Sequence, residues 1–223
     1  MSTKSRGKLG EDKVKALLKK EKGYFKILND ITFVVGKTEM SHQIDHIFIH
    51  PHGVFVIETK NYYGEIICDT NDSFWLKIVK GKKEKISNPL RQNKSHMYVV
   101  YKLLKQKYDV IPVVVFVKNN APYIDDNAIN LSDLHLFIES YPYKKELDKT
   151  DIDYIYKELK SKASNLSKAE HLENISYLKE MKQEFRLEME YALENGICPR
   201  CDNKIIEKGF EYHCSKCDFK FKL

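Results

Sequence analysis

The amino-acid sequence predicts an α/β protein with a mixed sheet between helices, followed by a helical segment and a small cysteine-rich module. Three observations support this prediction. Residues 43–60 read QIDHIFIHPHGVFVIETK, two apolar runs around HPHG that are typical of a β-hairpin. Residues 110–118 read VIPVVVFVK, a β-branched run typical of a strand that is buried on both faces. Four of the five cysteines lie after residue 197.

Length and composition narrow the class of protein. The 223 residues, of which 42% are hydrophobic, suffice for one α/β domain of ordinary size with a small appendage. The net charge of +6 is compatible with a polyanionic partner without requiring one. No apolar run approaches the roughly 20 residues that span a bilayer, and the N-terminus lacks the hydrophobic segment of a secretory signal. We therefore expect a cytoplasmic protein without a membrane partner.

Apolar periodicity and turn residues predict the order of elements before residue 149. Asn88 and Pro89 indicate the start of a helix, because Asn caps helices and Pro is tolerated in the first turn. Ser132 is a possible cap of the next helix. The strand–helix–strand order favours a mixed or parallel sheet. The expected helices are 8–21, 89–107 and 131–140, and the expected strands are 24–35, the two arms of the hairpin, 64–69, 73–81, 83–87 and 110–118.

The composition changes beyond about residue 149. Residues 151–195 contain no proline, and apolar residues recur at spacings of three and four, which predicts a short helix and then a long one. Ser167 and Glu170 fit a capping box at the start of the long helix, which would end near Gly196. The long helix could join two copies of the chain in a homo-oligomer or fold back on the core. The predicted division is a domain over 1–148, a helical stalk over 149–196 and a cysteine-rich module over 197–223.

The central hairpin carries charge where an inner strand normally excludes it. If Pro51 and His52 form a regular turn, Asp45 lies directly opposite Glu58, with Cβ atoms about 5 Å apart. Lys60 lies two residues beyond Glu58 and therefore projects from the same face. Two carboxylates this close repel unless a cation lies between them, and Mg²⁺ binds through carboxylates, waters and phosphates. The three side chains suit metal-assisted phosphodiester hydrolysis, and a structural ion-pair triad at the end of the sheet is the alternative.

Asp45 and the later run ETK at 58–60 resemble the D…ExK signature of the PD-(D/E)xK nuclease superfamily. Three segments narrow the resemblance to its nuclease-related domain (NERD) family. They are GEDKV at 10–14, the hairpin with its continuation NYYGEI, and NPLRQNKSHM at 88–97. These segments follow one another in the order of the family and cover roughly residues 5–120.

The resemblance implies a restriction-endonuclease-like core that acts as a Mg²⁺-dependent (or Mn²⁺-dependent) nuclease, with DNA as the expected substrate. It implies that Asp45 and Glu58 bind the metal with the backbone carbonyl of Thr59, and that Lys60 assists the attacking water or the phosphate. Ile44 departs from the signature by replacing its proline, which does not perform the chemistry. A non-catalytic nucleic-acid-binding or protein-interaction module on the same fold is the alternative function.

Glu11 and Gln92 are further candidate catalytic residues. Glu11 shares a helix face with the apolar Val14, an unusual position for an acid, and the resemblance implies a role near the metal. Gln92 falls on a stripe with His96, and the resemblance implies that it orients the substrate or Lys60. The alternatives are an acid favoured by the helix dipole for Glu11 and a purely structural role for Gln92.

Histidines and lysines crowd the segments around the hairpin. We expect no histidine metal site, because polar residues are common at the turn and alternation directs His46 away from the carboxylates. The four histidines are His42, His46, His50 and His52. Five lysines follow in a basic hairpin: Lys77, Lys80, Lys82, Lys83 and Lys85. They could hold phosphates, or they could simply deter pairing at the edge of a sheet.

The cysteines near the C-terminus form two CxxC pairs, CPRC and CSKC. In a reducing compartment such pairs are better explained as metal ligands than as disulfides. Cys198, Cys201, Cys214 and Cys217 together offer the four thiolates of a structural Zn²⁺ site, and their spacing resembles a zinc ribbon with a short β-hairpin between the pairs. The aromatic residues of this module could stack on bases or could serve only to fold it.

Overall fold

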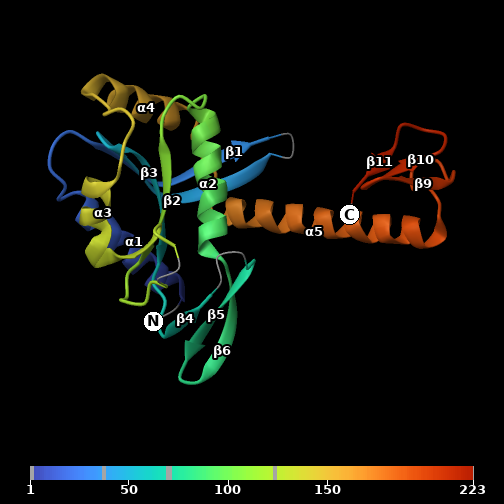
Figure 1. The fold of residues 1–223 in the computed structure, drawn as a ribbon, viewed down its shortest axis with the longest axis horizontal. Helices are drawn as coiled ribbons and strands as arrows, with labels where there is room; N and C mark the ends of the chain where they lie inside the picture. Colours follow the sequence, from blue (N-terminus) through green and yellow to red (C-terminus); the bar gives the residue numbers. More distant parts are fainter. Residues whose placement is uncertain (1–2, 37–38, 69–71, 123–124, 223) are drawn as a thin grey trace. The chain divides into compact units, whose positions relative to one another are not determined.

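The computed structural model of the chain describes residues 3–36, 39–68, 72–122 and 125–222. The chain divides into two compact units, residues 1–166 and 167–223. In the first unit the elements are α1 (Thr3–Leu18), β1 (Lys26–Val35), β2 (Met40–His50), β3 (Gly53–Lys60), β4 (Glu65–Ile67), β5 (Phe74–Val79), β6 (Lys82–Ser87), α2 (Pro89–Leu103), β7 (Val110–Phe116), β8 (Ala128–Asn130), the 3-10 turn η1 (Leu131–Asp133), α3 (Leu134–Ser140) and α4 (Lys149–Ser161) (Figure 1). The second unit contains α5 (Lys168–Asn195), β9 (Ile205–Lys208), β10 (Glu211–Cys214) and β11 (Lys220–Phe221).

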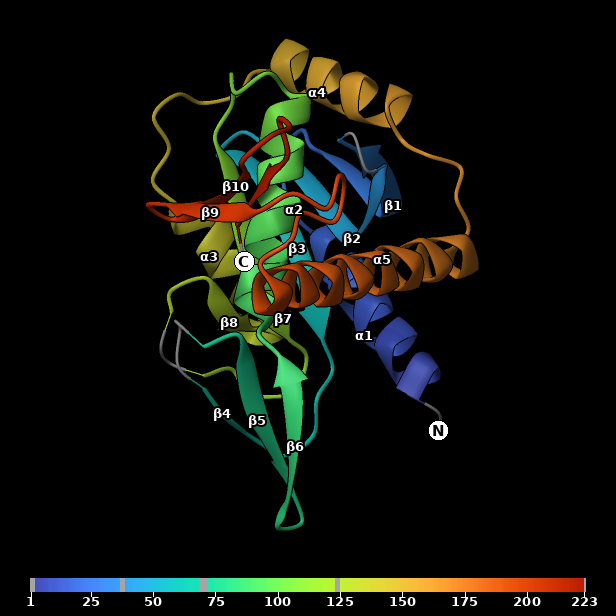
Figure 2. The same cartoon turned by 90° about the vertical axis from the view of Figure 1, so that its right-hand side faces the viewer.

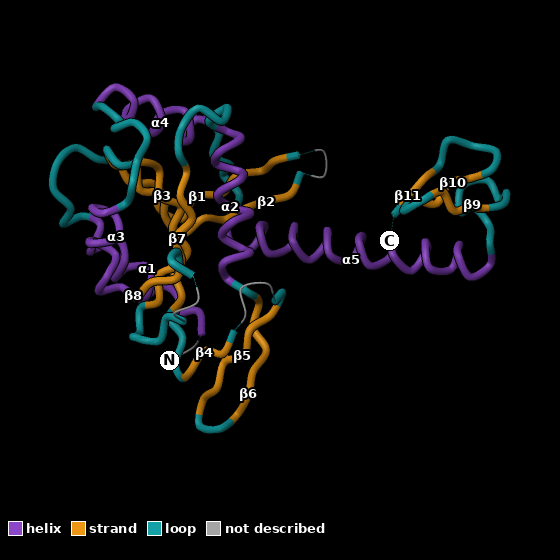
Figure 3. The backbone as a smooth tube through the Cα atoms, viewed as in Figure 1, coloured by secondary structure: helices purple, strands orange, loops and turns teal. Residues whose placement is uncertain are grey.

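A five-stranded mixed sheet forms the centre of the first unit (Figure 3). Its strand order is β1-β2-β3-β7-β8. The pairs β1–β2 and β2–β3 are antiparallel, whereas β3–β7 and β7–β8 are parallel. The chain passes through α2 between the parallel strands β3 and β7, as a strand–helix–strand crossover requires. The predicted α/β class with a mixed sheet is confirmed.

Helices cover both faces of this sheet, which explains why its central strands are apolar on both sides (Figure 1). On one face, Val100 of α2 and Ile155 of α4 belong to one buried cluster with alternate residues of β2 and β3. On the other face, Val14 of α1 and Leu134 of α3 belong to a second cluster that contains Phe48. The strands β2 and β3 therefore lie between α1 and α2.

The two units divide the chain differently from the predicted domains. α4 belongs to the first unit, because Ile155 and Leu159 are fully buried in the same cluster as the strands. In the predicted division, this helix is part of a stalk that begins at residue 149. In the second unit Met189 and Ala192 of α5 share a core with the cysteines, so a boundary after residue 196 would cut through that core.

Two of the predicted helix caps are present. Asn88 accepts hydrogen bonds from the first backbone N–H groups of α2, and Ser167 and Glu170 form the capping box of α5. The third prediction was wrong. Ser132 lies inside the 3-10 turn, and Asp133 occupies the cap position of α3 without a side-chain bond to the backbone.

The long helix α5 buries apolar side chains only near its C-terminal end, at Met189 and Ala192. Several large apolar side chains along it are about half exposed: Leu172, Tyr177, Met181, Phe185 and Tyr191. Association of two chains through this helix stays a prediction. Among the described residues, no helix combines the length and the hydrophobicity that crossing a bilayer demands.

Candidate functional site

The hairpin of β2 and β3 positions the predicted acidic residues. Residues 46–50 pair with residues 53–57 in the predicted register. The ladder ends there, so Asp45 and Glu58 are not direct cross-strand partners as the sequence suggested. Instead, the Asp45 carboxylate accepts a hydrogen bond from the backbone N–H of Thr59, at 2.8 Å from Oδ2 to N. The Asp45 side chain is therefore held against β3 at Thr59, one residue after Glu58, which was the expected partner.

A local irregularity in β1 and β2 accounts for this shift. Asp30 of β1 lies opposite Asp45 and has a left-handed conformation with φ of 51°. These two residues do not form a pair in the β1–β2 ladder, although their neighbours on both sides do. Ile44 and Ile47 lie in the same core cluster although they are three residues apart, which a regular alternating strand does not allow. The strand is twisted at Asp45, and this twist directs the carboxylate toward β3.

Glu58, Lys60 and Gln92 form a connected polar group beneath α2. Lys60 Nζ lies 2.5 Å from Glu58 Oε1 and donates a second hydrogen bond to Gln92 Oε1 at 3.2 Å. His96, one helical turn after Gln92, places Nδ1 3.6 Å from Glu58 Oε2. The side chains of Glu58 and Lys60 are only 6% and 14% exposed, so this ion pair is largely shielded from water. The sequence pattern places His96 on the same helical stripe as Gln92, but it does not indicate that His96 belongs to the site.

Burial and neighbouring charges shift the pKa values of the three charged groups. Burial, and then the nearby Glu58, raise the pKa of Asp45. Burial also acts to raise the pKa of Glu58, but Lys60 and His96 outweigh it and hold that pKa low. For Lys60, burial acts to lower the pKa, but Glu58 outweighs it and keeps the pKa above its ordinary value. Glu58 and Lys60 thus form a stable carboxylate–ammonium pair, whereas the surroundings of Asp45 oppose the ionisation of its carboxyl group.

α1 brings Glu11 to the edge of this group. The close approach depends on Gly10, where a Cβ atom would lie 3.0 Å from Asn61 Cβ and 3.3 Å from Thr59 Cγ2. After burial and Glu58, Glu11 adds to the rise in the pKa of Asp45, so the two carboxylates lie within electrostatic range. The side chain of Glu11 is 16% exposed and lies 3.7 Å from Lys8 Nζ.

We expect Gly10→Ala to destabilise the first unit by about 1–3 kcal/mol, because the added methyl group would push α1 away from β3. Gly7→Ala is the matched control on the same helix, since a Cβ atom there meets no atom within 4 Å. That change should be neutral or stabilising by up to about 1 kcal/mol, as Ala favours helix over Gly. Urea denaturation of the two variants measures the difference, and equal midpoints would contradict the close contact at Gly10.

The described residues contain two groups of three or more His, Cys, Asp or Glu whose ligand atoms all lie within 4.8 Å of one another. One consists of Glu21, His135 and Glu139, in which His135 Nδ1 lies 2.8 Å from Glu21 Oε2. The other is the predicted cysteine cluster. The acids of the hairpin are not in such a group: Asp45 accepts a hydrogen bond from a backbone amide, and Glu58 is paired with Lys60.

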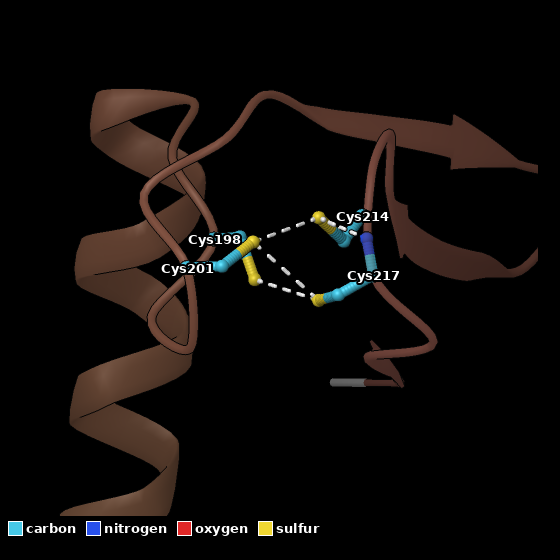
Figure 4. A group of neighbouring side chains, drawn as sticks. All are labelled: Cys198, Cys201, Cys214 and Cys217. Atoms are coloured by element: carbon cyan, nitrogen blue, oxygen red, sulfur yellow. Dashed lines mark hydrogen bonds between the residues drawn. The ribbon is translucent and has the colours of Figure 1, made fainter.

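The four cysteines converge as predicted (Figure 4). Their Sγ–Sγ distances are 3.4 Å for Cys201–Cys214, 3.5 Å for Cys201–Cys217 and 3.8 Å for Cys198–Cys217. Zn–S bonds of about 2.3 Å in a tetrahedron require Sγ–Sγ distances of about 3.8 Å, close to this arrangement. Figure 4 shows the two CxxC pairs facing each other from separate loops. The cluster could therefore hold a metal ion such as zinc.

The sulfurs differ in their tendency to ionise. Backbone N–H groups of Cys217 and Lys216 lower the pKa of the Cys214 thiol to about 6. The backbone at Phe219 acts to lower the pKa of Cys217, but burial and the other sulfurs raise it to about 12. Four thiolates this close would repel one another, so full ionisation requires a cation among them.

Comparison with known proteins places this arrangement in a family. A family model described as the nuclease-related domain, NERD, matches residues 6–117. The chain belongs to the NERD family. An uncharacterized protein of Bacillus anthracis is 32% identical over 161 residues, which cover 69% of this chain and 74% of that protein. No solved structure matches the chain significantly. The NERD match contains α1, the central hairpin, α2 and β7, and hence every predicted site residue of the first unit.

Proposed function

We propose that this NERD protein is a Mg²⁺-dependent nuclease of the PD-(D/E)xK type that hydrolyses phosphodiester bonds in DNA. The observation that carries the proposal is the meeting of Asp45, Glu58 and Lys60 where the pairing of β2 with β3 ends, and where Gln92 and Glu11 approach from the two flanking helices. Two acids and a lysine in a largely buried group are costly to keep for stability alone.

The donors in this group fit a hard divalent cation. Asp45, Glu58 and the backbone carbonyl of Thr59 would supply oxygen ligands, which Mg²⁺ and Mn²⁺ prefer. Thr59 Oγ1 is a buried polar atom without a hydrogen-bond partner, and it lies on the α1 side of β3, from which Glu11 approaches, opposite Glu58 and Lys60. Bound by Asp45 and Glu58, the cation would polarise the phosphate and supply a nucleophilic water.

The remaining side chains would act on the substrate and on one another. Lys60 offers an ammonium group that can stabilise the charge developing on the phosphate. Gln92 would act as a positioning residue, because its Oε1 accepts a hydrogen bond from Lys60 Nζ. Glu11 would add negative charge near Asp45 and so strengthen the attraction of a cation.

We expect Lys60→Met to lower the rate of Mg²⁺-dependent DNA cleavage on the order of a hundred- to a thousandfold, because the phosphate loses its ammonium partner. Lys102→Met on the exposed part of α2 is a charge-matched control that should leave the rate unchanged. Cleavage of a fluorescent DNA substrate under single-turnover conditions measures both variants. Equal rates for wild type and Lys60→Met would contradict a catalytic role of Lys60, and a wild-type protein without cleavage would favour the non-catalytic module, in which Lys60 and Glu58 form only a structural ion pair.

We also propose that the four cysteines of the second unit hold one structural Zn²⁺. The Sγ–Sγ distances and the separate loops that supply the two pairs support this proposal. Such an ion would join these loops near the end of α5, where Cys198 is fully buried beside Met189.

A further inference from the structure

The small sheet of β4, β5 and β6 has one face that is turned away from the core. Trp75, on the inner face, is 1% exposed and packs in a cluster with Val114 and Phe116. Alternate residues of β5 therefore point outward, and the strand registers place their partners on the same side. This outer face consists of Glu65, Ile67, Phe74, Leu76, Ile78, Lys83, Lys85 and Ser87.

The outer face exposes apolar and basic groups together. Phe74 is 50% exposed and Ile67 46% exposed, which is unusual for neighbouring positions of a sheet. Lys85 Nζ lies 4.2 Å from the centroid of the Phe74 ring, and Lys83 is exposed one pair further along β6. Among the described residues of this face, Glu65 is the acid, and it lies on the edge strand β4. Lys85 thus lies over one face of a half-exposed ring, so a base can stack on Phe74 when this lysine turns from the ring to a phosphate, and Lys83 can contact a phosphate further along the strand.

Both ends of the small sheet are fixed to elements that carry proposed site residues. Residues 61–64 connect Lys60 to β4, and Asn120 Nδ2 donates to the carbonyls of Tyr62 and Gly64, each at 3.1 Å. A Cβ atom at Gly64 would lie 1.9 Å from a carbonyl oxygen of β5, so only glycine allows this approach.

The other end is held by Asn88, which caps α2 and donates from Nδ2 to the carbonyl of Asp72 at 2.7 Å. Figure 2 shows β5 and β6 extending from the core beside the start of α2. The same helix carries Gln92, which contacts Lys60. The small sheet is thus held at both ends by segments next to elements that carry proposed site residues.

We propose that the outer face of β4–β6 binds an unpaired strand of DNA next to the active site, with Phe74 stacked on a base and Lys83 and Lys85 on phosphates. This inference rests on the proposed nuclease function and names the form of DNA that the enzyme holds. An unpaired strand fits better than a duplex, because stacking on Phe74 requires a base face that pairing and stacking within a duplex would cover.

Fluorescence anisotropy with a labelled oligothymidylate, in the full chain and without added Mg²⁺, tests the proposal. We expect Phe74→Ala and Phe74→Leu to weaken binding roughly ten- to a hundredfold, because neither side chain can stack on a base. Lys83→Ala should reduce the slope of log affinity against log salt by about 0.7, the contribution of one phosphate contact on a single strand. Lys82→Ala is the matched control: Lys82 pairs with Val79 on the inner side of the registers, so the salt slope should not change.

Affinities of both Phe74 variants equal to wild type would overturn the proposal, and so would a Lys82→Ala effect as large as that of Lys83→Ala. Tighter binding of a duplex, unaffected by Phe74→Leu, would also overturn it.

Because binding is measured without Mg²⁺ and therefore without cleavage, a failure of the binding proposal can be distinguished from a failure of the nuclease proposal. A wild-type protein that cleaves DNA while the Phe74 variants bind normally would contradict only the role of the outer face. Loss of binding in the Phe74 variants of a protein that never cleaves DNA would support the face and contradict the nuclease.

Discussion

Replacing Asp45 with asparagine is expected to abolish Mg²⁺-dependent DNA cleavage without unfolding the protein. Asparagine keeps a side-chain oxygen that can accept the backbone N–H of Thr59, now 2.8 Å from Asp45 Oδ2. It removes the negative charge that a divalent cation needs from this ligand. We expect the single-turnover rate to fall by on the order of a thousandfold. The melting temperature should equal or exceed that of wild type, because the change removes a carboxyl group whose ionisation burial and Glu58 oppose.

Asp30→Asn provides the control for this change. Asp30 lies opposite Asp45 on β1, is exposed, and accepts a hydrogen bond from Gln43 Nε2 that asparagine can also accept. The charge change is identical, but the side chain has no place in the proposed site. We expect the rate of wild type. If Asp45→Asn cleaved DNA as fast as Asp30→Asn, the Asp45 charge would have no catalytic role, and the group would be an ion-paired scaffold.

Replacing Cys217 with serine is expected to remove one zinc ion per chain and to unfold the cysteine-rich part of the second unit. Structural zinc contributes on the order of 10–16 kcal/mol of binding free energy, far more than this small core can supply without it. The first unit has a separate core and should melt as before. Elemental analysis measures the metal, and hydrogen exchange of residues 198–222 measures the unfolding.

Cys68→Ser is the matched control for the zinc prediction. Cys68 is the fifth cysteine, is partly buried in the first unit and lies outside the cluster. That variant should keep its zinc and its protected amides. A Cys217→Ser variant with unchanged zinc content and unchanged exchange would contradict the metal site.

The sequence predicted the hairpin and its charged end, but not how Asp45 is held. The register of the hairpin follows from the assumption of a symmetric turn, and the structure shows this register over five residue pairs. Two polar residues, Asn29 and Asp30, interrupt the apolar and aromatic residues of the expected strand 24–35, yet their effect on the next strand depends on the left-handed conformation of Asp30. Such a twist arises from pairing between strands, which a count of residues along one hairpin does not contain.

The role of α4 shows a second limit. Periodicity identifies the apolar face of a helix but not the surface against which that face packs. Ile155 and Leu159 therefore predicted a helix correctly, whereas its assignment to a stalk came from the change in composition near residue 149. His96 was not assigned to the site for a similar reason. Its contact with Glu58 requires α2 to lie over β3, and only the packed structure supplies that.

The metal-binding role of the hairpin acids is the central claim, and a crystal structure of the protein soaked in Mn²⁺ tests it most directly. Anomalous diffraction at the manganese edge should show one ion between the carboxylates of Asp45 and Glu58, next to the carbonyl of Thr59. Lys60 would then leave Glu58 Oε1, to which it is now bonded at 2.5 Å, or share it with the ion. No anomalous peak between these carboxylates, at a Mn²⁺ concentration that saturates cleavage, would contradict the account.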